Sequence, residues 1–292
     1  MQRIQRGWRG ALLALALIGA GCTSQPDPGA GQPAAASVSA TSSSGTARAA
    51  SVTLPPAAGK FSYQIGGGYP PAAGVTIVDR DHSEPPAAGR YSICYLNAYQ
   101  AQPDALAWWT AQHPRLLLRG KAGAVVIDDE WDEALFDISS PSRRAELLSV
   151  IGGWIDHCAA AGYRAVEADN LDSYTRSDGL LSAANALAFG RALAQRAHHD
   201  GLAIGQKNAA ELSMQARQAG FDFAIAEECQ AYSECESYSA VYGNELIEIE
   251  YTDQPARLFN AACASRGRSV SVVLRDRNVT PAGDSAHVER WC

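Results

Sequence analysis

The sequence predicts an α/β fold: a (β/α)8 TIM-type barrel, preceded by a signal segment and a disordered linker. Short apolar runs alternate with helical patterns along residues 60–292. Near-continuous apolar strands of this kind are typical of a parallel sheet that is covered on both faces. About eight such units in about 233 residues approach the roughly 250 residues of one barrel domain.

Residues 1–21 have the pattern of a signal peptide. Arg3, Arg6 and Arg9 precede an apolar stretch that is too short to span a bilayer. Small residues then lead to Cys22, which resembles the lipidation site of a bacterial lipoprotein. A plain secretory signal cleaved nearby is the alternative. We therefore expect an exported protein, either secreted or held at the outer face of the bacterial cell membrane through this lipid anchor alone.

Residues 22–59 are expected to form a flexible linker. Ala, Ser, Thr, Gly and Pro dominate this segment, and no apolar period runs through it. Such a chain cannot bury enough surface to offset its conformational entropy. One folded domain, residues 60–292, remains.

Within this domain the apolar runs define the expected elements. Two stretches, Ser142–Ala160 and Ser182–Asp200, carry apolar residues at three-to-four spacing and predict amphipathic helices. Ser142 is one candidate for the N-cap of the first helix, and Gly201 is a candidate stop for the second. The predicted strands are Phe61–Ile65, Val75–Asp79, Tyr91–Leu96, Leu135–Ile138, Tyr163–Ala168, Leu202–Gln206, Phe221–Ala226, Leu246–Glu250 and Ser269–Leu274.

The domain contains six cysteines, and an even number in an exported chain indicates disulfides. A metal site is the alternative, which the absence of any CxxC pair disfavours. The expected pairs are Cys229–Cys235, Cys263–Cys292 and Cys94–Cys158.

Carboxylates gather where the predicted strands end. Val166 leads to Glu167 and Asp169, Ala226 leads to the Glu227-Glu228 pair, and Lys207-Asn208 follows the strand between them. In a barrel the chemistry lies at the carboxyl ends of the strands. These positions therefore predict an acid-rich site at one mouth of the barrel.

Alternation along the strands places Glu167 and Asp169 on one face, and Glu248 and Glu250 likewise on one face. Carboxylates that converge over one mouth shift each other's protonation, so that one stays protonated while another stays ionised. Glycoside hydrolysis requires such a pair. Lys207 could hold an ionised acid nearby.

The same polar residues have alternative interpretations. Asn170 and Asp172 could simply form turns, and Asp128-Asp129-Glu130 is expected to be a solvated loop. A metal cluster of Asp169, Asp172 and Glu227 is conceivable, but a mixed Lys and acid mouth needs no ion. We expect neither a metal nor a cofactor.

Aromatic side chains and net charge bear on the partner. Flat aromatic faces suit sugar rings, with core packing as the alternative use. Lys+Arg 24 against Asp+Glu 31 gives a net charge of −7 without a long basic run, which argues against nucleic-acid binding. The aromatic residues in or beside the predicted strand-end loops are Tyr95, Trp108, Trp109, Trp131, Tyr174, Tyr232 and Tyr251.

Four blocks of the sequence match one family in order and spacing. They are residues 163–174 (YRAVEADNLDSY), 201–208 (GLAIGQKN), 221–235 (FDFAIAEEC with YSEC) and 250–252 (EYT). These blocks resemble glycoside hydrolase family 114, the endo-α-1,4-polygalactosaminidase family of TIM barrels. The resemblance covers about residues 60–275.

The resemblance implies an endo-acting, cofactor-independent hydrolase of α-1,4-linked galactosamine-rich, cationic polysaccharide, and we expect a monomer. Its catalytic pair falls on Asp169 and Glu227; alternation alone leaves Glu227 and Glu228 undistinguished, and the family pattern favours the first. A non-catalytic polysaccharide-binding barrel and a glycosidase for another amino-sugar polymer are the alternatives. Retention and inversion both remain open. The expected substrate-binding residues are Tyr95, Glu167, Asn170, Asp172, Tyr174, Lys207, Asn208, Glu250 and Tyr251.

Overall fold

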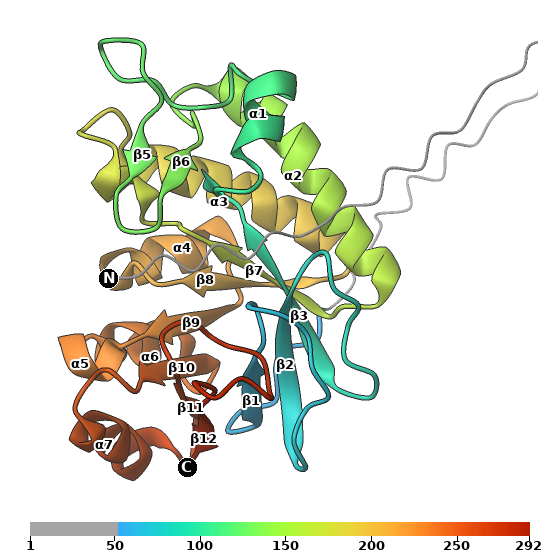
Figure 1. Cartoon of the computed structure of the whole chain (residues 1–292), viewed down its shortest axis with the longest axis vertical. Helices are drawn as coiled ribbons and strands as arrows, with labels where there is room; N and C mark the ends of the chain where they lie inside the picture. The colour runs from blue at the N-terminus through green and yellow to red at the C-terminus, as the bar shows by residue number, and fades with distance from the viewer. Residues whose placement is uncertain (1–51) are drawn as a thin grey trace, which may run out of the picture. The chain divides into compact units, whose positions relative to one another are not determined.

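The computed structural model describes residues 52–292, so the expected signal peptide, Cys22 and most of the expected linker lie outside the described residues. Each of eight strands runs parallel to its neighbours in one sheet (Figure 1). The TIM-type barrel prediction is confirmed. In sheet order the strands are β1 (Lys60–Tyr63), β2 (Val75–Asp81), β3 (Tyr91–Asn97), β7 (Ala165–Asp169), β8 (Ala203–Lys207), β9 (Phe223–Glu227), β10 (Leu246–Tyr251) and β11 (Ser271–Arg275).

The barrel closes between β11 and β1 with the help of a ninth strand. β12 (Glu289–Trp291) pairs antiparallel with β11. The indole of Trp291 donates to the carbonyl of Phe61 in β1 (2.7 Å), and Ser62 donates to the Glu289 carboxylate (2.6 Å). The Arg275 guanidinium of β11 also donates to the carbonyl of Tyr63. Side chains therefore join the two ends of the sheet.

Helices cover the barrel from β3 onward. The connection after β1 (residues 64–74) and the connection after β2 (residues 82–90) contain no helix, because both are short and rich in proline and glycine. None of the described helices is long and apolar enough to cross a membrane. The helices are α1 (Leu106–Gln112), α2 (Pro141–Ala161), α3 (Ala183–His199), α4 (Ser213–Ala219), α5 (Cys229–Tyr232), α6 (Cys235–Tyr242) and α7 (Ala256–Arg266), with the 3-10 turns η1 (Ser173–Arg176) and η2 (Ala210–Leu212).

Both predicted helices form, and one predicted cap is wrong. Ser140, not Ser142, caps α2: its hydroxyl accepts from the Arg143 amide, and Pro141 occupies the first helical position. Ser182 caps α3 in a capping box. Gly201, at φ 77°, follows the end of α3 in the left-handed conformation that stops a helix.

The connection from β3 to β7 carries a small antiparallel sheet outside the barrel. Its order is β4 (Gln100–Ala101), β6 (Glu133–Leu135) and β5 (Ile127–Asp128). The predicted strand Leu135–Ile138 enters this sheet through Leu135, so its apolar run belongs to the excursion and not to the barrel.

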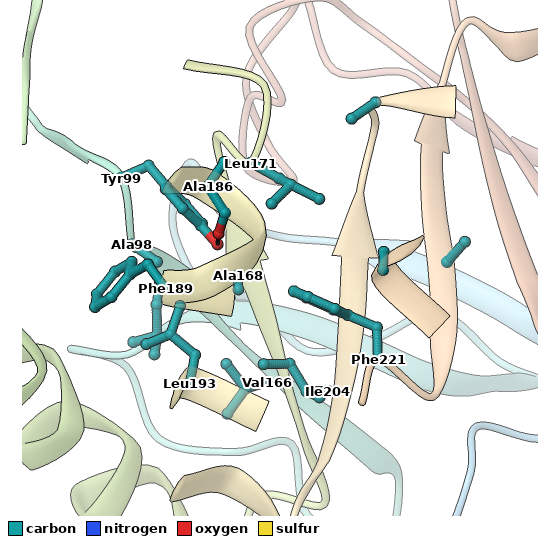
Figure 2. Close-up of a cluster of buried hydrophobic side chains, with 14 of the residues drawn as sticks. Ala98, Tyr99, Val166, Ala168, Leu171, Ala186, Phe189, Leu193, Ile204 and Phe221 are labelled. Carbon is teal, nitrogen blue, oxygen red and sulfur yellow. Dashed lines mark hydrogen bonds between the residues drawn. The ribbon is translucent and has the colours of Figure 1, made fainter. Parts of the chain in front are cut away.

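Alternation separates two cores. Val166 and Ala168 of β7 face outward beneath Phe189 and Leu193 of α3, where they form part of the cluster in Figure 2. The alternate strand residues, such as Ala165 and Ile225, fill the barrel interior. Gly205 leaves room there for the Phe223 ring, which would lie 2.8 Å from an added Cβ.

Residues 52–59 form the end of the expected linker, and part of this segment is attached to the barrel. Val52 and Leu54 pack against the interior cluster, and the Tyr91 hydroxyl donates to the Thr53 carbonyl (2.6 Å). Apolar side chains in an otherwise small-residue segment provide this attachment.

Candidate active site

The inward-facing residues change from apolar to polar at the carboxyl ends of the strands. Glu167 and Asp169 end β7, while Lys207, Glu227 and Tyr251 end the next three strands. Because parallel neighbours are in register and alternate residues share a face, these side chains meet at one mouth.

Lys207 lies at the centre of this group and is 2% exposed. Its Nζ is 2.7 Å from Glu167 Oε1, 3.3 Å from Asp169 Oδ1 and 3.3 Å from Glu227 Oε2. Burial disfavours the ammonium ion, but the three carboxylates outweigh burial and hold the pKa of Lys207 well above its usual value. Lys207, Glu167, Asp169 and Glu227 are called the Lys207 cluster below.

The two expected catalytic carboxylates face each other in this cluster. Since Asp169 Oδ1 and Glu227 Oε2 each lie 3.3 Å from the same Nζ, these two oxygens are at most twice that distance apart. Both carboxyl groups stay partly open to solvent, with side-chain exposures of 16% and 25%. They are therefore accessible from the mouth.

Neighbouring hydrogen-bond donors fix both carboxylates. Asp169 Oδ2 accepts from the Tyr95 hydroxyl (2.6 Å), and its Oδ1 accepts from the backbone amide of Asn170 (2.8 Å). Glu227 Oε2 accepts from the Asn208 side chain (2.9 Å), and its Oε1 accepts from the Tyr251 hydroxyl. The expected residues Tyr95, Asn208 and Tyr251 thus contact the pair directly.

The environments displace the two pKa values in opposite directions. Burial raises the pKa of Asp169 despite the opposing charge of Lys207. Burial also acts on Glu227, but the Lys207 charge and the hydrogen bonds from Tyr251 and Asn208 outweigh it and lower that pKa. The directions of these shifts make Asp169 the more readily protonated member of the pair in the free protein.

Two buried residues beneath the cluster lie outside the sequence prediction. The Tyr63 hydroxyl donates to Glu167 Oε1 (3.2 Å) and accepts from Lys207 (2.9 Å). Asp79 is fully buried, and neither of its oxygens has a hydrogen-bond partner among the described residues. Burial and the adjacent Glu167 hold the pKa of Asp79 well above its usual value, which favours the neutral form of this carboxyl. An acid at the end of the apolar run of residues 75–78 was the available signal.

Residues from the β3–β7 excursion border the pair. Glu133 Oε2 accepts from the Asn97 side chain (2.8 Å) and, more weakly, from Asn170 (3.4 Å). Burial raises the pKa of Glu133 to about 7. Asn170 has φ 70°, the left-handed conformation that asparagine tolerates, so its predicted turn role and its place beside Asp169 coincide.

Other expected residues lie apart from the cluster. Arg176 binds both Asp172 (2.9 Å) and the buried Asp128 (2.5 Å), so the expectation of a solvated loop is wrong for Asp128. Tyr174 donates to Glu211 (2.5 Å).

Glu250 faces the helices instead of the mouth. Its Oε1 accepts from the Gln230 amide of α5 (3.0 Å), while Glu248 on the same face pairs with Arg266 of α7 (2.8 Å). The interior positions of β10 belong to Ile247, Ile249 and Tyr251. The placement of Glu250 at the mouth is therefore wrong. Glu228 also turns away and binds Arg277 through both oxygens (2.8 Å each).

The structure pairs all six cysteines of the domain as expected. The bonds are Cys94–Cys158, Cys229–Cys235 and Cys263–Cys292. Among the described residues, the one group of three possible metal ligands within mutual reach is Cys229, Cys235 and Glu248. Because these two sulfurs are bonded to each other, that group cannot act as a thiolate site. The alternative cluster of Asp169, Asp172 and Glu227 is not brought together.

A parallel barrel with paired carboxylates at its carboxyl-end mouth is the arrangement of a glycoside hydrolase. The chain matches the family model described as "Glycoside-hydrolase family GH114" over residues 41–292, and it belongs to this family. No curated protein sequence matches it significantly.

Two solved structures share the fold. One is Ega3 of Aspergillus fumigatus in complex with galactosamine, at a TM-score of 0.66 and 24% identity over 83% of this chain and 98% of that chain. The other is the glycoside hydrolase domain of PelA of Pseudomonas aeruginosa, at a TM-score of 0.50 and 19% identity over 77% of this chain and 97% of that chain.

Proposed function

We propose that the chain is an exported, endo-acting hydrolase of α-1,4-linked galactosamine-rich polysaccharide, with Asp169 and Glu227 as its catalytic pair. The observation that carries the proposal is the single ammonium group 3.3 Å from both carboxylates, which keeps them within reach of one glycosidic bond. Membership of the family and the galactosamine bound to Ega3 support the substrate class. A net charge of −7 favours the approach of a polycation.

The spacing favours retention of configuration. Retaining glycosidases place their carboxyl groups about 5–5.5 Å apart, and inverting ones about 6.5–9.5 Å apart. Oxygens separated by at most twice 3.3 Å fit the shorter range better. One carboxylate would attack the anomeric carbon while the other gives its proton to the departing glycosidic oxygen. Water, deprotonated by that second group, would then cleave the glycosyl-enzyme ester.

The chain's own residues prepare this step. Lys207 reduces repulsion among Glu167, Asp169 and Glu227 and keeps the attacking group ionised. Tyr95 and Tyr251 orient one carboxylate each. Substrate charge developing at the sugar ring would meet a net negative mouth, which stabilises an oxocarbenium-like state.

The decisive experiment is cleavage of a partly deacetylated galactosamine polymer, followed as new reducing ends. Asp169→Asn and Glu227→Gln should each lower the rate by at least ~10²-fold, because each removes a proton-transfer or attacking group. Glu228→Gln is the matched control, since Glu228 binds Arg277 away from the pair. Full activity in either of the first two variants removes that residue from the mechanism.

Two further readouts separate the alternatives. Azide should restore turnover when the attacking carboxylate is replaced by alanine. If azide rescues neither the Asp169→Ala nor the Glu227→Ala variant, that failure contradicts retention. A binding barrel without catalysis would leave the polymer intact while retaining it. Oligosaccharides with and without acetyl groups would reveal a preference for another amino-sugar polymer.

Export and a lipid at Cys22 belong to the same proposal. Three disulfides agree with an oxidising compartment, where such bonds persist. The mass of the mature N-terminus in cell fractions distinguishes a lipid-tethered protein from a freely secreted one, and an unprocessed cytosolic chain contradicts export.

A further inference from the structure

A cavity of about 270 Å³ opens between the carboxyl ends of β2 and β3 and the helices α1 and α2. Its walls combine indole and imidazole rings with side-chain amides. The residues used below are Trp108, Trp109, Trp154, His82, Asn97 and Gln100, and together they are called the tryptophan pocket. Aromatic walls with a few polar groups are typical of small-molecule sites.

The aromatic walls are held in place by one another. His82 stacks on Trp154, with centroids 4.6 Å apart and ring planes 12° from parallel. Trp109 is buried and lies edge-on to both Trp154 (5.9 Å) and Trp108 (5.0 Å). Trp108 itself is 45% exposed, so a large apolar ring remains open to a ligand. This wall is preorganised, which limits the entropy lost on binding.

Gln100 is a fixed part of the pocket wall. Its side chain is 1% exposed, and its Nε2 donates to Asp128 (3.1 Å), which fixes the orientation of the amide. Its Oε1 has no hydrogen-bond partner among the residues that the structure describes. This oxygen is inaccessible to solvent, so it lies within the pocket wall and is not open to a ligand.

Asn97 links the pocket to the candidate catalytic pair. It lines the pocket and lies in register with Asp169 on the neighbouring strand, at the spacing of about 4.8 Å that separates paired strands. Its side chain accepts from Asn170 (3.0 Å) and donates to Glu133 (2.8 Å). A polymer that passes between Asp169 and Glu227 therefore has this pocket beside it. Asn97 and the Glu133 carboxyl group lie between the pocket and the pair.

We infer that the tryptophan pocket is a separate sugar-binding subsite, which holds a galactosamine unit of the polymer away from the bond being cleaved. The exposed face of Trp108 packs against the sugar ring. The identity of this ligand rests on the proposed function. Short substrates contact only the catalytic pair and do not extend into this pocket.

The test uses binding so that it does not depend on turnover. In an Asp169→Asn background, galactosamine oligosaccharides of increasing length are titrated by calorimetry. Adding Trp108→Ala should weaken the longer oligosaccharides about tenfold, or ~1.4 kcal/mol, and leave the shortest unchanged. Trp131→Ala is the matched control, because Trp131 is also exposed (52%) but does not line the pocket. A Glu227→Gln background serves as the second host.

Equal affinity of the Trp108→Ala protein and its parent at every length overturns the inference, as does an equal loss in the Trp131→Ala control. If the wild-type protein cleaves galactosamine polymer but Trp108→Ala leaves oligosaccharide binding unchanged, the proposed function stands and the subsite is rejected. A wild-type protein that leaves the polymer intact removes the proposed function. Length-dependent binding that requires Trp108 would then still establish the subsite.

Discussion

At the carboxyl end of β8, one buried ammonium group faces three carboxylates at 2.7 to 3.3 Å. The arrangement is costly to break, because removal of one partner of a buried ion pair leaves the others without compensation. Lys207 therefore links the stability of the mouth to its chemistry.

Replacement of Lys207 by methionine should lower the free energy of unfolding by about 3–5 kcal/mol at neutral pH. Without the cation, which lowers the pKa values of both Asp169 and Glu227, repulsion raises the folded-state pKa values of these two groups. Stability is then fully retained below the unfolded pKa values and lost as pH rises through the raised ones. Urea unfolding at pH 4 and pH 8 measures the difference.

Lys121→Met is the control for this change, since Lys121 is exposed on a loop. A Lys207→Met protein as stable as the wild type at pH 8 would show that the carboxylates do not need the ammonium group.

Single residues of the site were predictable where alternation was sufficient. Glu167 and Asp169 lie two positions apart and share the interior face, as expected. Alternation also places Glu248 and Glu250 together, but it does not say which face is the interior when both are buried. Asp79 reaches Glu167 through the register of three strands, which no local pattern contains.

The elements show the same limit on a larger scale. Most strands of the barrel appear where apolar runs predict them, because a run of buried residues is a local property. Which sheet a run joins is not local: Leu135 pairs with Gln100 in the excursion. The excursion matters for function, since it carries Glu133 to the mouth and Trp108 to the adjoining pocket.

The outward face of β10 provides a test of packing between elements. Glu250 is buried against α5, and burial raises its pKa to about 7. For an acid raised in the folded state, the stabilising contribution is complete below the unfolded pKa and disappears as pH rises through 7. Glu250→Gln, which mimics the neutral form, should be more stable than the wild type by about 3 kcal/mol at pH 8 and equal to it at pH 4.

Chemical denaturation across this pH range measures the effect. Glu236→Gln, an exposed change on α6, should shift the unfolding midpoint at neither pH. A Glu250→Gln protein that loses stability at pH 8 would mean that the ionised carboxylate is needed where it lies.

For the whole molecule, barrel closure depends on contacts between distant parts of the chain. β12 supports the seam between β11 and β1, and the Cys263–Cys292 bond ties the residue after this strand to α7. The bond closes a loop with a sequence separation of 29, whereas Cys229–Cys235 closes one of 6.

The longer loop should contribute more stability. Replacing Cys263 and Cys292 by serine should cost about 3–4 kcal/mol, and replacing Cys229 and Cys235 about 2 kcal/mol, because cross-links restrict the unfolded chain according to loop length. Thermal unfolding of the two double variants ranks them. The reverse order would show that native packing, and not loop entropy, dominates.

The seam also dictates an order of events during synthesis. Trp291 bonds to Phe61 across 230 positions, so a nascent chain exposes the bare edges of β1 and β11 until residues 289–292 have been made. Unpaired edges are templates for intermolecular pairing, and a ribosome-bound or truncated chain would be vulnerable to aggregation for as long as they stay open. Completion of this barrel therefore waits for the synthesis of residues 289–292.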